Sequence, residues 1–150
     1  MKLWMLFVLG GLTAWGSYVP TVHAGQAALK GGALKAFLCV GAAYFLTAVL
    51  APLGLLAAKM EPWEFNTRGV ALSTLAGVLG AVGALCMILA LKSGGTPLVV
   101  APLVFGGAPI VNAFVSMALH KPASPPVPLF YLGLLMVGAG AFLVLRYRPT

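Results

Sequence analysis

Charged side chains are scarce in this sequence. Only 7% of its 150 residues are Asp, Glu, Lys or Arg, and 61% are hydrophobic, whereas a soluble protein carries about 25% charged residues. So few charges cannot cover a surface that faces water, which excludes an ordinary soluble domain and makes lipid the main solvent. We expect one transmembrane domain over residues 1–150.

Acidic residues are the rarest of all, with Glu61 and Glu64 set against nine Lys and Arg, for a net charge of +7. The basic residues are scattered singly, as in the loops of membrane proteins, so we expect no nucleic-acid partner. Cys39 and Cys86 lie in hydrophobic stretches without metal-ligand spacing, and we expect neither a metal nor a cofactor. No nucleophile–base pair is visible, so we do not expect an enzyme.

Five stretches without charge or histidine make up most of the chain. Crossing the hydrocarbon takes a helix of about 20 apolar residues, and lipid leaves no partner for unpaired backbone groups. The alternating pattern of a β-barrel is absent. We therefore predict an all-α membrane protein, a bundle of five transmembrane helices at about residues 3–22, 37–58, 70–91, 97–119 and 129–145.

The first stretch also has features of a signal peptide. Lys2 gives it a basic start, and Val22-His23-Ala24 resembles a cleavage site. The apolar run, however, exceeds the roughly 7–15 residues of a signal core, and Trp15-Gly16-Ser17 and Pro20 suit a packed helix. We expect the segment to be retained; cleavage would leave four helices.

Lys and Arg divide almost evenly between the two sides of the membrane. Five spans place four on one side and five on the other, namely Lys2, Lys59, Arg68 and Lys121 against Lys30, Lys35, Lys92, Arg146 and Arg148. Orientation normally follows the asymmetry of these residues, which is close to zero here. Two alternatives stay open: insertion in both orientations, or one orientation decided by local features.

Aromatic and polar side chains inside the spans are candidates for a substrate path. Asn112 is the only amide within a span, and an intramembrane polar group usually points inward. We predict a path lined by Trp15, Tyr18, Tyr44, Asn112 and Ser116. Packing and interhelical hydrogen bonding are the alternatives, and the hydroxyls of Thr13, Ser17 and Thr21 either line a cavity or bind the backbone one turn back.

Helix-disrupting residues gather in the fourth span. Pro102 and Pro109 each remove a backbone hydrogen bond, and Gly106 and Gly107 lie between them. We predict a helix break at Pro102, Gly106, Gly107 and Pro109, of the kind that transporters use to expose backbone to a substrate. Pro52 should bend the second span.

Small residues repeat along one face of the third span. Ser73, Gly77, Gly80 and Ala84 follow each other at i, i+4, i+7 and i+11. Because lipid gives helices no hydrophobic reason to associate, small residues mark where backbones approach closely. We predict that these four residues form a packing seam, either within the chain or between subunits.

Several motifs occur together in an order that is characteristic of one family. They are Trp15-Gly16-Ser17, the glycines at 77, 80 and 83, Ala90–Gly94, Pro109, Tyr131-Leu132-Gly133 and Val137-Gly138. The chain resembles one half of an EamA-type transporter of the drug/metabolite transporter superfamily over nearly its whole length. The resemblance implies two inverted five-helix halves around a central path. This chain supplies one half, so the resemblance also implies a second chain. That chain is either another copy, in an antiparallel or a parallel homodimer, or a homologous half.

Two departures from related families bear on the substrate. EamA-type proteins commonly carry a Glu after the fourth helix, where this chain has Leu119-His120-Lys121-Pro122, and small multidrug resistance proteins carry one in the first helix, which residues 13–17 lack. Cationic drugs are therefore poor candidates. We expect transport of a small neutral or zwitterionic metabolite across a bacterial inner membrane; the alternative is a non-transporting accessory subunit of a larger membrane complex.

Overall fold

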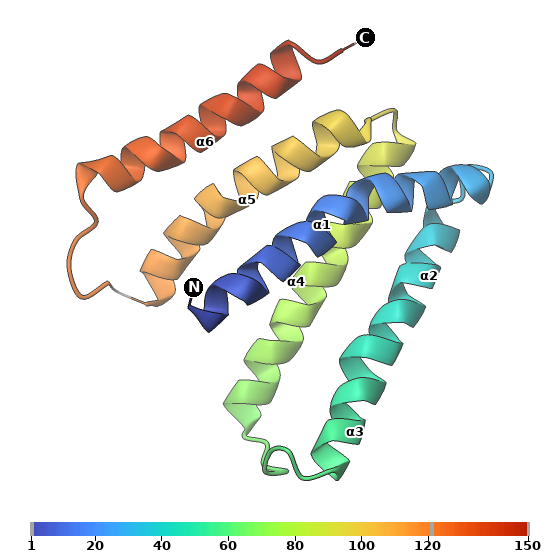
Figure 1. Ribbon diagram of the computed structural model, residues 1–150, viewed down its shortest axis with the longest axis vertical. Helices are drawn as coiled ribbons and strands as arrows, with labels where there is room; N and C mark the ends of the chain where they lie inside the picture. Colours follow the sequence, from blue (N-terminus) through green and yellow to red (C-terminus); the bar gives the residue numbers. More distant parts are fainter. Residues whose placement is uncertain (1, 121, 150) are drawn as a thin grey trace. The chain divides into compact units, whose positions relative to one another are not determined.

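The computed structural model describes residues 2–120 and 122–149, where every regular element is a helix. The elements in order are α1 (Leu3–Ala28), α2 (Ala33–Phe45), the π-helical η1 (Leu46–Leu50), α3 (Ala51–Ala57), α4 (Thr67–Lys92), α5 (Pro97–Leu119) and α6 (Pro128–Arg146) (Figure 1). The segments α2, η1 and α3 follow one another without a gap and form one rod. Five rods are long and apolar enough to cross a membrane, which confirms the prediction of an all-α multi-pass membrane protein.

The rods differ most from the predicted spans at the end of the first one. Helix α1 continues to Ala28, six residues past the predicted end at residue 22, so His23 and Gln26 lie inside it. Lys30 and Gly31 then turn the chain with φ of 55° and 73°. Lys121, part of the departure from the EamA pattern, lies outside the described residues.

The helices group into two compact units, residues 1–20 with 94–150 and residues 21–93. The first unit contains most of α1 together with α5 and α6. The second contains the end of α1 together with α2, η1, α3 and α4. Since α1 contributes to both units, the expectation of a single transmembrane domain stays a prediction.

In the first unit, α5 and α6 lie side by side (Figure 1) and approach closely through glycines. A Cβ added at Gly106 would lie 3.0 Å from the Cβ of Ala141, and one added at Gly138 would lie 3.3 Å from Cδ1 of Ile110. Close backbone approach is the main source of helix association in lipid. These two glycines therefore determine how tightly α6 packs on α5.

Helix α5 runs without interruption through both of its internal prolines. The structure thus does not divide the helix at Pro102, Gly106, Gly107 and Pro109 as the sequence predicted. A proline removes one backbone hydrogen bond and its ring crowds the carbonyl four residues back, but transmembrane helices tolerate such disturbances where neighbouring groups compensate. Gly106 contributes to helix packing instead.

The core of the second unit lies where α1, α2 and α4 meet. Ala33 and Ala36 of α2 are buried, as are Met87, Ile88 and Leu91 of α4. Alanine on α2 lets its backbone come close to the larger side chains of α4. This packed end holds the unit together.

The predicted seam on α4 is covered at one end only. Ala84 is 3% exposed, whereas Ser73, Gly77 and Gly80 are exposed. Within residues 21–93, three of the four seam residues therefore have no helix packed over them.

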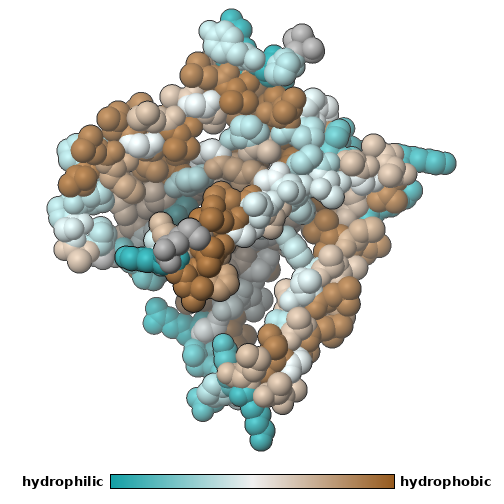
Figure 2. All heavy atoms as spheres, viewed as in Figure 1, coloured by the Kyte–Doolittle hydropathy of each residue, from teal (hydrophilic) through white to brown (hydrophobic). Residues whose placement is uncertain are grey.

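Large hydrophobic side chains point outward along all five rods. Leu79 of α4 is 64% exposed and Leu135 of α6 is 68% exposed, and brown hydrophobic atoms cover much of the surface seen in Figure 2. A water-soluble protein rarely exposes such large apolar patches. This surface is suited to hydrocarbon.

Candidate functional site

Three aromatic rings meet between α1 and α5 in the first unit. The ring centroids of Trp15 and Tyr18 are 5.5 Å apart, and those of Trp15 and Phe105 are 6.0 Å apart with nearly perpendicular planes. Both separations suit tilted or edge-to-face aromatic contacts. The structure thus brings together two of the predicted path residues, Trp15 and Tyr18, and adds Phe105. The sequence did not predict Phe105, because no pattern showed which apolar side chain of α5 faces α1.

A pocket of about 510 Å³ lies beside these rings. The space beside its two glycines is empty, since a Cβ added at Gly11 or Gly16 would meet no atom within 4 Å. The volume falls in the range of small-molecule sites, about 300–1,000 Å³. We call it the Trp15 pocket, and it is lined by Val8, Gly11, Leu12, Trp15, Gly16 and Phe105.

Asn112 and Ser116 lie farther along the face of α5 that carries Phe105. They follow Phe105 at i+7 and i+11, which places all three on one side of the helix, about 10 and 16 Å apart along the axis from Phe105. Both side chains are exposed, and no hydrogen bond joins the Asn112 amide to any residue within 2–120 or 122–149. The interhelical hydrogen bond that was the alternative for Asn112 is therefore not made within the described chain.

Tyr44 belongs to the second unit and is 41% exposed near the end of α2. The next residues form η1, where the Ala51 N–H donates to the Leu46 carbonyl five residues back. Pro52 has no N–H to give the carbonyl of Ala48. The irregularity expected from Pro52 is thus a π-helical turn, a feature frequent at functional sites, while the role of Tyr44 in a substrate path stays a prediction.

Hydroxyl groups near the Trp15 pocket bind the backbone of their own helix. Thr13 Oγ1 donates to the carbonyls of Leu9 and Gly10 at 3.1 and 2.9 Å, and Ser17 Oγ donates to the Thr13 carbonyl at 2.8 Å. Thr47 in η1 does the same one turn back, at 2.9 Å. For Thr13 and Ser17 this confirms the alternative in which the hydroxyl donates a hydrogen bond to a backbone carbonyl one turn back.

Two polar side chains near the end of α1, in the second unit, have buried atoms. Gln26 is 4% exposed, and its Nε2 donates to the Ile88 carbonyl of α4 at 2.9 Å. Gln26 Oε1 and His23 Nδ1, one turn earlier, are buried and have no hydrogen-bond partner among the described residues. Sequence reasoning missed both, although the run from 23 to 28 contains no proline to end the helix.

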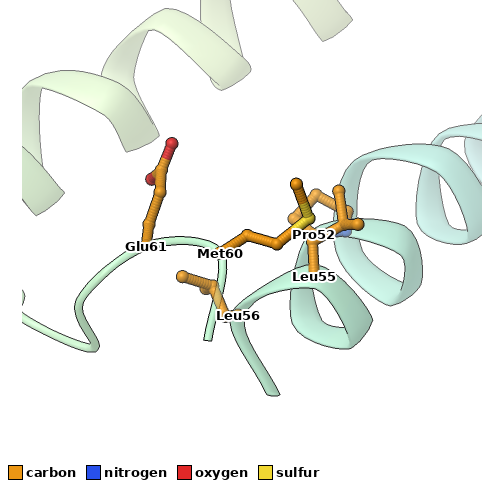
Figure 3. A pocket seen from close by; sticks show the side chains of 5 residues that line it. All are labelled: Pro52, Leu55, Leu56, Met60 and Glu61. Carbon is orange, nitrogen blue, oxygen red and sulfur yellow. The ribbon is translucent and has the colours of Figure 1, made fainter. Parts of the chain in front are cut away.

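A smaller pocket of about 280 Å³ lies in the second unit where α3 ends. Apolar groups of Pro52, Leu55 and Leu56 line it, and the Met60 side chain reaches toward them (Figure 3). Glu61 is at its rim, with the carboxylate pointing away from the other side chains (Figure 3).

Metal-binding clusters of three or more His, Cys, Asp or Glu are absent from residues 2–120 and 122–149. Comparisons with family models, curated proteins and solved structures find no match. The functional argument therefore depends on the residues themselves. The EamA resemblance stays a prediction, one of whose motifs, Trp15-Gly16-Ser17, borders the Trp15 pocket.

Proposed function

We propose that the protein is a transporter of the EamA drug/metabolite type that moves a small neutral or zwitterionic metabolite across a bacterial inner membrane. The observation that carries this proposal is the Trp15 pocket, an open hollow with aromatic walls between the membrane-spanning helices α1 and α5. Gly11 and Gly16 leave space in the site for a ligand, and the rings of Trp15 and Phe105 offer it apolar contact.

The lining of the Trp15 pocket supports the choice of ligand. None of its residues is ionisable, so a ligand with net charge would be desolvated without a counter-charge, at a cost of several kcal/mol. A neutral or internally balanced molecule avoids most of that cost. Asn112 and Ser116, on the same face of α5 as Phe105, supply hydrogen-bonding groups farther along the path.

The proposal includes a homodimer or a pair with a homologous half. A single five-helix chain has its ends on opposite sides, so an inverted pair needs a second chain of opposite orientation. The nearly equal division of Lys and Arg is compatible with both orientations. The uncovered part of the α4 seam offers a surface for such a partner.

Flux of candidate solutes into proteoliposomes tests the proposal. We expect uptake of at least one neutral or zwitterionic metabolite above that of empty liposomes, and loss of most of it in Trp15→Ala because the pocket loses its wall. Trp4→Ala is the matched control, since Trp4 lies on the same helix but outside the pocket. Equal flux in the two variants would remove Trp15 from the site.

The second candidate is an accessory subunit that does not transport. The exposed Ser73, Gly77 and Gly80 favour it, because small residues on an uncovered face suit docking against another protein's helix. C-terminal reporter fusions separate the two ideas. A single topology without a homodimer would support the accessory subunit, whereas two topologies would support the inverted pair.

A further inference from the structure

An open apolar groove follows the packed helices α5 and α6. Its volume is about 530 Å³, and its walls include Phe114 of α5 and Leu135, Ala139 and Phe142 of α6. Phe114, Leu135 and Phe142 are 55%, 68% and 62% exposed, so no described residue of the first unit covers them. In a membrane-spanning protein this groove opens to the hydrocarbon.

The groove has the length and direction of a lipid acyl chain. From Tyr131 to Phe142 it follows eleven residues of α6, or about 16 Å at 1.5 Å per residue. One leaflet of the hydrocarbon core is about 15 Å deep, half of the roughly 30 Å total. Because α6 crosses the membrane, the groove runs in the direction in which acyl chains extend.

A basic group stands at the end of the groove near Phe142. Leu135, Ala139, Phe142 and Arg146 follow at i, i+4, i+7 and i+11, so Arg146 continues the same face of α6. It is the last residue of that helix, and its Cζ lies 5.5 Å from the ring centroid of Tyr147. Arg146 has no salt bridge to any carboxylate of the described residues, which leaves its guanidinium available for a phosphate.

A second protein helix fits this groove poorly. Helices associate in lipid through small residues that let backbones approach, whereas large rings of Phe114, Tyr131 and Phe142 stand along this groove. They leave a channel suited to a narrow, flexible chain. Basic residues at the end of a membrane helix attract anionic lipid headgroups.

We propose that the groove between α5 and α6 binds an anionic phospholipid, with one acyl chain against Phe114, Leu135, Ala139 and Phe142 and the phosphate on Arg146. Arg148, two residues later, adds a second positive charge to the headgroup site. The site does not depend on transport and lies apart from the residues that line the Trp15 pocket.

Native mass spectrometry of the full chain, released from vesicles of equal phosphatidylglycerol and phosphatidylcholine content, tests this site. We expect one retained phosphatidylglycerol in at least several-fold preference over phosphatidylcholine. The double variant Arg146→Gln/Arg148→Gln should abolish the preference, while Lys92→Gln, at the end of α4, should keep it. Equal retention of the two lipids by the unchanged protein would overturn the proposal.

Filling the groove with a larger side chain provides a second, independent test of lipid binding. Ala139→Phe should lose the retained lipid, whereas Leu143→Phe, on the same helix but outside the groove, should retain it. Circular dichroism confirms that each variant stays helical. Equal lipid retention in Ala139→Phe and Leu143→Phe, or a change in oligomer mass with no change in lipid, would show that the groove does not hold a lipid chain.

Discussion

Replacing Gln26 by Leu should stabilise the protein, although Gln26 makes the hydrogen bond that joins α1 to α4. The lost bond, from Nε2 to the Ile88 carbonyl, is worth about 0.6 kcal/mol by the average for membrane proteins. That carbonyl lies inside α4 and keeps the helical donor four residues on. The change also removes the buried, unpartnered Oε1, which costs roughly 1–3 kcal/mol. The difference predicts a gain of about 0.5–2 kcal/mol.

Equilibrium unfolding in mixed micelles with increasing SDS measures this free energy. Thr13→Ala is the control, because Thr13 is exposed and its hydroxyl donates to the carbonyls of Leu9 and Gly10 in its own helix, so we expect a change within about 0.5 kcal/mol. A loss of stability of 1 kcal/mol or more in Gln26→Leu would refute the reasoning. It would mean that Oε1 has a partner in the membrane, such as a bound water.

Three further variants test the helix packing and the path. Gly106→Ala should destabilise the protein by about 1–3 kcal/mol through overpacking, because the new Cβ would lie 3.0 Å from the Cβ of Ala141. Gly107→Ala is the control and should not destabilise, because its Cβ would meet open space. Equal effects of the two variants in the same unfolding assay would contradict the α5–α6 contact. Asn112→Ala should lower any detected flux, and unchanged flux would make the assignment of that residue wrong. Gly77→Ile should shift the mass in detergent from dimer to monomer if the α4 seam joins subunits, and a dimer of unchanged mass would place the subunit contact elsewhere.

Apart from the end of α1, every predicted span begins and ends within four residues of the observed helix. The fourth predicted span, 97–119, coincides with α5, and the fifth, 129–145, lies within one residue of α6 at each end. At the end of α1 the prediction stopped too early. His23 and Gln26 looked like boundary residues, but contact with α4 buries Gln26 inside the helix.

Two of the three rings at the aromatic site were predictable and the third was not. Helical spacing alone places Trp15 and Tyr18 on one face. The third ring, Phe105, depends on how α5 lies against α1. The same holds for Gly106, which resembles a helix breaker in sequence but serves as a contact for Ala141 of α6.

By itself the sequence determined that the chain crosses a membrane as five helices and where most of them begin and end. The reason is that hydrocarbon solvates neither charge nor unpaired backbone, so the length of each neutral run sets its span. Only the tertiary structure decided which faces meet, as at Gly106 with Ala141 and at Gln26 with Ile88. Lipid gives helices no hydrophobic drive to pair, so pairing follows from local shape and single hydrogen bonds, which one-dimensional patterns do not contain.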